Sequence, residues 1–195
     1  MFEILTTDQM RQADVLAVAS GIPSLELMEN AGRAVANAVT GSFGTVRPVI
    51  VVAGPGNNGG DGLAIARQLK KKGCNTDVFI IRVSEKDSPD FSANLQRLET
   101  DKIPFRIVND AEEIKFPANA NFHIIDALFG SGLSREPDGL AAKVIAKMNA
   151  VNADKISIDI PSGLFGDDNS GNSYKHIVRA TYTLSFQHPK LSFLF

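Results

Sequence analysis

The sequence has little of what marks several classes of protein. Its 195 residues contain one cysteine, Cys74, so no disulfide framework can form within the chain, and we expect an ordinary thiol in a reducing cytoplasm. No apolar stretch approaches the roughly 20 residues of a membrane-spanning helix, and the first residues lack the apolar core of a signal peptide. These absences predict a cytoplasmic protein with no membrane partner.

Charge of one sign is also scarce. The chain has 20 Lys and Arg residues and 22 Asp and Glu residues, and its one basic run, Lys70, Lys71 and Lys72, suits the end of a helix. A nucleic-acid-binding surface needs clustered basic side chains, so we do not expect nucleic acid as a partner. The three histidines have no metal-ligand spacing, and we expect His123 to be a core or sheet residue.

Strand and helix patterns alternate along the chain. Apolar runs predict strands over residues 49–52, 76–83, 105–108, 121–128, 155–160 and 180–186. Helical spacing predicts helices over residues 8–20, 24–39, 63–72, 90–99 and 139–149. With 44% hydrophobic residues and no linker or internal repeat, residues 1–195 are expected to form a single domain. The repeated βα units predict an α/β fold with a parallel sheet and helices on both faces.

A glycine-rich segment joins the first expected strand to the helix that follows. Val49, Ile50, Val51 and Val52 are β-branched, as in a strand buried on both faces of a parallel sheet. Residues 54–62, GPGNNGGDG, contain five glycines, which we expect to allow positive φ angles and the close approach of a ligand. Because the free N–H groups of a helix start point toward an anion, the segment predicts an anion-binding turn.

Two further loops lie at the edge of the sheet where a ligand is expected. In open α/β sheets this edge is at the carboxyl ends of the strands. Asp126 and Asp159 stand at the ends of the fourth and fifth expected strands, and Ser162 follows in a glycine-containing loop. Carboxylates in such positions act as acid or base groups or as cation ligands, although a single one is as often a turn cap. Together with the glycine-rich segment, they predict one shared pocket.

The motifs of two common nucleotide-binding classes are incomplete. Gly54, Gly56 and Gly59 satisfy the G-x-G-x-x-G pattern, but Arg82 ends the second strand where a Rossmann dehydrogenase has an acidic residue for the ribose. A P-loop needs Lys followed by Ser or Thr where this helix opens with Asp61. Because a carboxylate repels phosphate, we expect Asp61 to hold the loop or a ribose hydroxyl. An NAD-linked dehydrogenase and a P-loop enzyme are both disfavoured.

Four motifs are recognisable along the chain. They are Glu29-Asn30-Ala31-Gly32, Asn57-Asn58-Gly59-Gly60-Asp61-Gly62, Asp126-Ala127-Leu128-Phe129-Gly130-Ser131-Gly132-Leu133 and Asp159-Ile160-Pro161-Ser162-Gly163. In this order, and over nearly the whole chain, they resemble the YjeF N-terminal domain family, the NAD(P)H-hydrate epimerases. The resemblance implies a Rossmann-like three-layer αβα sandwich with a mostly parallel sheet. It also implies an isomerase that interconverts the R and S forms of hydrated NADH or NADPH.

The resemblance further implies which residues bind. The hydrated nucleotide would contact Asn57, Asn58, Gly59, Gly60, Asp61, Gly130, Ser131, Gly132, Leu133, Ser134, Arg135, Glu136 and Asp159. A potassium ion would be held by Asn58, Asp126 and Ser162, although these oxygen ligands do not distinguish potassium from sodium. We hypothesise that Asp159 is catalytic, because inversion at C6 of the hydrated nicotinamide needs a proton donor and acceptor.

Expectations about partners come from the same resemblance. The family is usually homodimeric, and Gly32 and the small residues of the two helices before the first strand indicate where a partner subunit would pack. A fused or separate NAD(P)H-hydrate dehydratase repairs the S form. Family members usually continue past the equivalent of Phe195, so we expect a chain truncated from a longer or bifunctional protein. Lys190 matches a lysine common after the family's sixth strand, and a solvated lysine is an equal alternative.

A non-catalytic domain of the same fold is the competing interpretation. Some such domains are scaffolds that bind nucleotide, RNA or protein, and they tend to lose the acidic residues at the strand ends or the Asn-rich loop. This sequence keeps Asp126 and Asp159, and it keeps Asn57 and Asn58 in the loop. The sequence therefore favours an enzyme.

Overall fold

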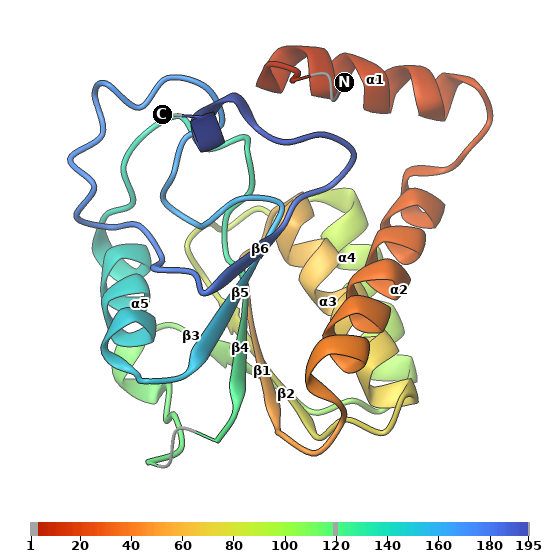
Figure 1. The fold of residues 1–195 in the computed structure, drawn as a ribbon. Helices are drawn as coiled ribbons and strands as arrows, with labels where there is room; N and C mark the ends of the chain where they lie inside the picture. The colour runs from red at the N-terminus through yellow and green to blue at the C-terminus, as the bar shows by residue number, and fades with distance from the viewer. Residues whose placement is uncertain (1–3, 119–120, 195) are drawn as a thin grey trace.

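A six-stranded sheet forms the centre of the computed structural model, which describes residues 4–118 and 121–194 (Figure 1). The strands are β1 (Val49–Ala53), β2 (Thr76–Ile81), β3 (Phe105–Val108), β4 (His123–Ala127), β5 (Asp154–Ile158) and β6 (Tyr182–Leu184). They lie in the order β3-β2-β1-β4-β5-β6, and every neighbouring pair is parallel. In this Rossmann order the winding reverses between β1 and β4, where a ligand-binding crevice is expected.

Helices cover both faces of the sheet. They are α1 (Thr7–Ala19), α2 (Ser24–Phe43), α3 (Asn57–Lys71), α4 (Pro89–Thr100), α5 (Gly139–Ala150) and the short η1 (Ala111–Glu113) and η2 (Leu191–Leu194). In Figure 1, α2, α3 and α4 lie on one face and α5 lies on the other. The predicted three-layer αβα sandwich is therefore confirmed.

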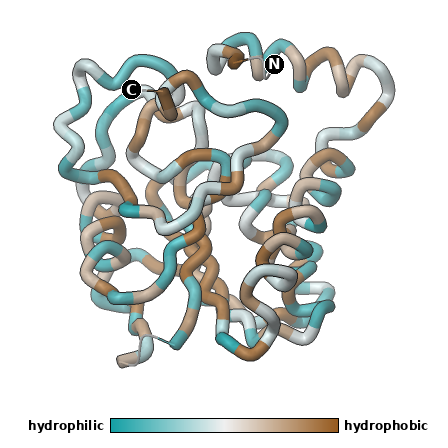
Figure 2. The backbone as a smooth tube through the Cα atoms, viewed as in Figure 1, coloured by the Kyte–Doolittle hydropathy of each residue, from teal (hydrophilic) through white to brown (hydrophobic). Residues whose placement is uncertain are grey.

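Two apolar layers hold the sheet between the helices. One contains Val51, Leu63 and Phe91 beneath α2, α3 and α4, and the other contains Val52 and Ile124 with residues of α5. The central strands are apolar on both faces, which Figure 2 shows as brown tube at the middle of the molecule. A strand buried on both faces has no polar alternation, which is why these runs could be recognised in the sequence.

Several strands are shorter than the apolar runs that predicted them. The run of residues 155–160 predicts a strand through Ile160, but β5 ends at Ile158 because Ile160 N–H turns back to the Ile158 carbonyl. Val83 N–H bonds to the Ile81 carbonyl in the same way after β2. Ile160 is fully buried, so its apolar character reflects packing under the loops and not pairing within the sheet.

The glycine-rich segment is mostly helix. We expected a turn over residues 54–62 with positive φ angles, but α3 begins at Asn57, and none of the five glycines has a positive φ. At Gly54, Gly59, Gly60 and Gly62 the missing side chain permits close packing instead. A Cβ on Gly59 would lie 1.7 Å from the Gly54 carbonyl oxygen, and one on Gly62 would lie 2.6 Å from Ala127 Cβ. The close neighbours in the structure are atoms of the protein itself, and the expected approach of a ligand stays a prediction.

Helix α1 lies next to the C-terminal tail, above the layer of α2, α3 and α4 in Figure 1. A Thr6 capping box starts α1, and Thr7 N–H donates to the Asp167 carboxylate. Leu5 pairs with Lys190 in an isolated parallel bridge. These contacts hold the start of α1 against the tail and the loop after β5.

The predicted role of Gly32 needs one correction. A Cβ on Gly32 would lie 3.0 Å from Ala64 Cβ, so this glycine is buried against α3 and does not face a partner subunit. The exposed apolar side chains before the first strand instead include those of Val15, Leu16 and Val18 on α1.

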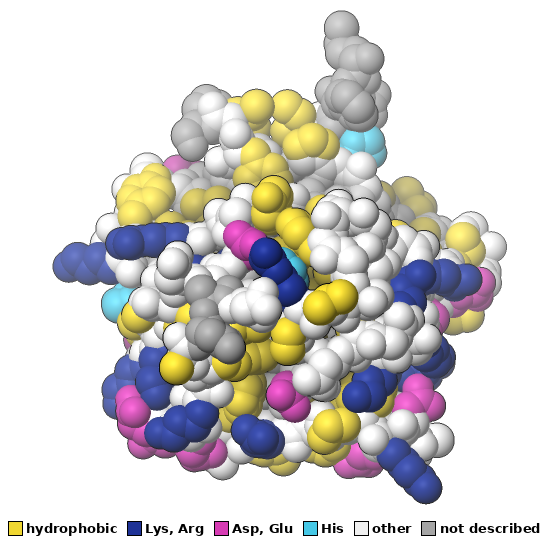
Figure 3. Space-filling view, turned by 60° about the horizontal axis from the view of Figure 1, so that its bottom comes forward, with side chains coloured by type: hydrophobic (Ala, Val, Ile, Leu, Met, Phe, Trp, Pro, Cys, Tyr) yellow, Lys and Arg dark blue, Asp and Glu magenta, His cyan; other side chains and the backbone are white. Residues whose placement is uncertain are grey.

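The remaining surface carries mixed charge. On the face in Figure 3, Lys and Arg side chains are interspersed with Asp and Glu side chains. No helix of the described chain is long and apolar enough to cross a membrane.

Packing at Gly59 gives a test of the fold. Replacing Gly59 by Ala should lower the melting temperature by at least about 5 °C, because the new methyl group collides with a fixed carbonyl oxygen and such overpacking costs about 1–3 kcal/mol or more. Gly56→Ala is the matched control, since a Cβ there meets nothing within 4 Å. Equal melting temperatures for the two variants would contradict this packing.

Candidate functional site

The Asp126 carboxylate lies at the centre of the candidate site. Asp126 is the last residue but one of β4, and it is fully buried. Its carboxylate accepts four hydrogen bonds, from Leu128 N at 3.3 Å, Ser157 Oγ at 2.7 Å, Ser162 N at 2.9 Å and Ser162 Oγ at 2.6 Å. Burial raises the pKa of Asp126, and the hydrogen bonds from Ser162, Ser157 and Leu128 oppose that increase. One side chain therefore joins β4, β5 and the loop after β5.

Asn58 connects the start of α3 to the same cluster. Its Nδ2 donates to the Phe129 carbonyl at 2.7 Å, and Phe129 N–H donates to Ser162 Oγ at 2.8 Å. The Asn58 side-chain oxygen, Oδ1, is buried without a hydrogen-bond partner in the described structure. The segments after β1, β4 and β5 thus meet, as the sequence predicted.

The cluster of Asn58, Asp126 and Ser162 has the chemistry of a hard-cation site. It offers an amide oxygen, a carboxylate, a hydroxyl and the Phe129 carbonyl, and Asn58 Oδ1 is an unpartnered acceptor. A buried polar atom without a hydrogen-bond partner is rare in folded proteins. A hard cation with Asn58 Oδ1 as one of its ligands would explain why this oxygen has no hydrogen-bond partner. The described residues contain no cluster of three His, Cys, Asp or Glu side chains that would suit a transition metal. These oxygen atoms therefore fit a hard cation such as potassium or sodium, without distinguishing the two.

Asp159 lies beside this cluster in an uncommon backbone conformation. Its φ is +67°, and its N–H donates to the Leu184 carbonyl at 2.9 Å. Left-handed backbone is uncommon for residues other than glycine, although Asp adopts it more readily than most. Lys190 Nζ lies 2.6 Å from Asp159 Oδ1, and the two side chains are only 1% and 13% exposed. Asp159 is therefore held by an ion pair at the end of β5.

Asp61 is a second carboxylate near Asp159. It lies in the second turn of α3 and is half-buried, and its side chain forms no hydrogen bond to any residue that the structure describes. Burial raises the pKa of Asp61 well above its usual range, and the negative charges of Asp159, Asp14 and Asp90 raise it further. The loop-holding role that we expected for Asp61 is absent, whereas the expected ribose contact stays a prediction.

The second predicted binding segment, residues 130–136, divides into two parts. Gly130 packs against Asn58, where a Cβ would lie 3.1 Å from Asn58 Cβ, so the start of the segment belongs to the cluster. The Glu136 carboxylate instead accepts hydrogen bonds from Ser173, which lowers the pKa of Glu136. Ser134 and Arg135 are exposed. The structure thus places the first residues of the segment at the cluster and its end at the surface.

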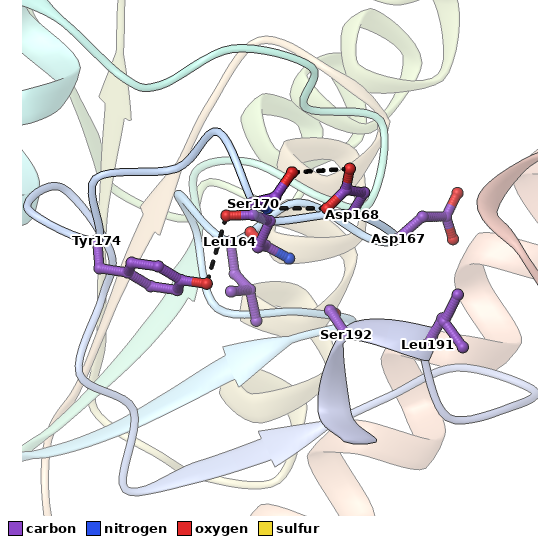
Figure 4. Close-up of a pocket in the computed structure, with 8 residues that line it drawn as sticks. Leu164, Asp167, Asp168, Ser170, Tyr174, Leu191 and Ser192 are labelled. Carbon is purple, nitrogen blue, oxygen red and sulfur yellow. Dashed lines mark hydrogen bonds between the residues drawn. The ribbon is translucent and has the colours of Figure 1, made fainter. Parts of the chain in front are cut away.

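Two cavities lie on either side of the expected crevice between β1 and β4. One, of about 320 Å³, lies between the loop after β5 and η2; Figure 4 shows its lining residues Leu164, Asp167, Asp168, Ser170, Tyr174, Leu191 and Ser192. The other, of about 480 Å³, lies at the carboxyl ends of β2 and β3 and is lined by Arg82, Val83, Ser84, Glu85, Ile107 and Asn109. Neither cavity is lined by Asp126 or Asp159.

Sequence reasoning missed several parts of the site. Ser157 lies inside β5, and nothing in its local sequence distinguishes it from an outward-facing polar residue. The sequence presents Lys190 either as the lysine common in the family or as a solvated lysine, and it does not predict the burial of Lys190 or its pairing with Asp159. Met10 of α1 closes over Lys190, with its sulfur 3.3 Å from Nζ. His123 is buried in β4, as predicted, and burial lowers its pKa.

Comparison with known proteins covers most of the chain. Residues 24–192 match the family model described as "YjeF-related protein N-terminus". An NAD(P)H-hydrate epimerase from Limosilactobacillus fermentum is 36% identical over 189 residues, which are 96% of this chain and 87% of that protein. A crystal structure of the yeast protein YNL200c has a TM-score of 0.79 and 27% identity, and the match covers 98% of this chain and 83% of that one.

A longer relative shares the same region. The bifunctional NAD(P)H-hydrate repair enzyme Nnr from Thermofilum pendens is 39% identical over 173 residues, which are 88% of this chain but 33% of that protein. The chain therefore spans about a third of the length of this relative.

The environment of Asp61 predicts a pH-dependent stability difference. Because the folded-state pKa lies above the unfolded value of about 3.9, protonation favours the folded state, and this stability is lost as the pH rises through the folded pKa. Asp61→Asn should therefore melt above the wild type at pH 8, by about 2–4 °C for each kcal/mol recovered, and the gap should close near pH 4. Thermal melts at both pH values test this, with Asp77→Asn, an exposed strand residue, as the charge control. A gap independent of pH would contradict it.

Proposed function

Because the chain belongs to the YjeF-related N-terminal family, we propose that it is an NAD(P)H-hydrate epimerase. The observation that carries this proposal is the cluster of Asn58, Asp126 and Ser162 at the β1/β4 switch point of a Rossmann-type sheet, with Asp159 in the same loop as Ser162. The enzyme is an isomerase that interconverts the R and S forms of hydrated NADH or NADPH. Such a reaction needs a nucleotide-binding crevice and one group that moves a proton, and this edge of the sheet offers both.

The substrate restricts the chemistry. Its C6 atom carries a hydroxyl group and is bonded to the ring nitrogen N1. Inversion can pass through loss of water to an iminium ion or through opening of the ring to an aldehyde. Either route needs a proton to be moved near C6, and neither needs a redox cofactor.

Asp159 is the residue that we assign to this proton movement. It stands at the carboxyl end of β5, keeps 13% of its side chain exposed and lies close enough to Asp61 to raise the pKa of that carboxyl. Asn57, Gly59, Gly60 and the segment from Gly130 form the proposed walls that orient the nucleotide. A potassium ion held by Asn58, Asp126 and Ser162 would supply fixed positive charge beside the polar parts of the substrate.

A scaffold without catalysis is the second candidate. Such a role needs none of the buried polar groups described above, and it would leave the Asn58 side-chain oxygen unexplained. The intact carboxylates at both strand ends favour the enzyme.

The cellular setting completes the proposal. A dehydratase, on a separate chain or in the same protein, would consume the S form, as the bifunctional name of the Thermofilum relative suggests. A cytoplasmic location fits the single buried thiol of Cys74.

We propose a homodimer whose contact lies on the exposed apolar side of α1. A sedimentation mass of one 20.9 kDa chain would contradict it.

Epimerisation of a defined substrate tests the assignment. Wild-type protein mixed with the R form of hydrated NADH should form the S form faster than the spontaneous reaction. Asp159→Asn should reduce the catalysed rate by at least about 100-fold, because proton transfer contributes roughly 10²–10⁴-fold, while nucleotide binding measured by calorimetry persists. Asp77→Asn serves as the control. A folded wild-type protein without activity would favour the scaffold.

Potassium dependence is a separate prediction. Saturating potassium should raise the melting temperature relative to tetramethylammonium, since a ligand at a hundredfold excess over its Kd stabilises by about 2.7 kcal/mol. Asn58→Ala removes the unpartnered oxygen and should abolish this shift, whereas Asn37→Ala on the exposed side of α2 should retain it. The same melting temperature for the wild type in both salts would exclude the site.

A further inference from the structure

Lys190 is an unusual lysine because it has almost no contact with solvent. Its side chain is 1% exposed, and burial of an ammonium group is costly unless it is paired. Nζ lies 2.6 Å from Asp159 Oδ1 and donates to the Phe186 carbonyl at 3.3 Å, and Met10 closes the remaining side. The lysine therefore occupies a site built from the tail, β5 and α1.

The two oxygens of Asp159 have different surroundings. Oδ1 faces Lys190 and also accepts the Phe186 N–H at 3.4 Å. Oδ2 has no hydrogen-bond partner among the described residues, and it is not one of the fully buried unpartnered atoms. The left-handed backbone of Asp159 and the ion pair together fix which oxygen remains open.

We infer that Lys190 is a positioning residue for the proposed epimerisation. It holds Asp159 as a carboxylate, with Oδ1 occupied and Oδ2 left for the C6 hydroxyl of the substrate. This inference rests on the proposed function and adds to it a residue outside the predicted binding set. The Lys190 ammonium group is therefore paired directly with the carboxylate to which we assign the proton movement.

A carboxylate at the start of the reaction selects one of the two routes. Asp159 Oδ2 takes the proton of the C6 hydroxyl, and the O–H electron pair forms the C6=O bond as the C6–N1 bond breaks. The electron pair of that bond passes to N1, and Asp159 returns the proton there. The aldehyde then turns about the C5–C6 bond, and the same steps in reverse close the ring on the other face. Asp159 ends as it began, and no other reactant is needed.

Replacement of Lys190 tests the positioning role. Lys190→Met keeps the length and apolar stem of the side chain but removes its charge. We expect kcat to fall by at least about 100-fold while KM changes by less than about threefold, because the lost interaction acts in the transition state. In Lys190→Ala, added ethylammonium should restore part of kcat. Lys143→Met, on the exposed side of α5, should match the wild type in both parameters.

The outcomes separate this inference from the proposed function. A wild type that does not accelerate epimerisation overturns both. If the wild type is active and the folded Lys190→Met variant has the same kcat, only the role of Lys190 is overturned. The same holds if the variant changes KM and leaves kcat unchanged.

The fate of the substrate oxygen gives a test that needs no variant. Epimerisation by the wild type in water labelled with heavy oxygen should yield an S product that keeps its original oxygen, because ring opening never releases the hydroxyl. Mass spectrometry of the product, corrected for the spontaneous reaction, measures this. One labelled oxygen in each converted molecule would show loss of water and overturn the inference.

Discussion

Burial of the Asp126 carboxylate constrains the whole of the candidate site. A carboxylate without solvent is tolerated only when its oxygens are hydrogen-bonded, and here the donors come from β5, from the loop after β5 and from its own loop. These loops can satisfy Asp126 only when they are brought together. Ser162 then reaches Phe129, and Phe129 reaches Asn58 at the start of α3. One electrostatic requirement thus fixes three segments that are distant in the sequence.

The close packing of α3 is the second constraint, and it depends on glycine. Gly54 and Gly59 let the first turn of the helix lie against the end of β1, at separations that no side chain would allow. This places Asn58 within reach of the loop after β4 and leaves Asp61 facing Asp159. The charge of Asp159 raises the pKa of Asp61, and the buried Lys190 forms an ion pair with Asp159. Packing of the backbone and electrostatics of the site are therefore coupled.

The architecture and much of the crevice could be predicted from local patterns. Apolar runs located all six strands, and their alternation with helices predicted the parallel sheet. The predictions failed where packing and local pattern differ. Ile160 is apolar because it is buried under a loop, so the fifth strand is shorter than its apolar run predicts. The glycines of residues 54–62 are expected to have positive φ angles, but none of them does. Gly32 was assigned to a partner surface, yet it packs within the chain.

The sequence by itself determined the order of elements and placed Asp126, Asp159, Ser162 and the Asn-Asn pair beyond strand ends, because hydrophobic periodicity and glycine-rich loops are local signals. Only the tertiary structure decided which of these groups touch. It paired Lys190 with Asp159, left Asn58 Oδ1 without a partner among the described residues and brought Met10 of α1 against Lys190. A lysine in a polar tail has the same local sequence whether it is solvated or buried. Its environment comes from segments distant along the chain, and that information exists only once the chain has folded.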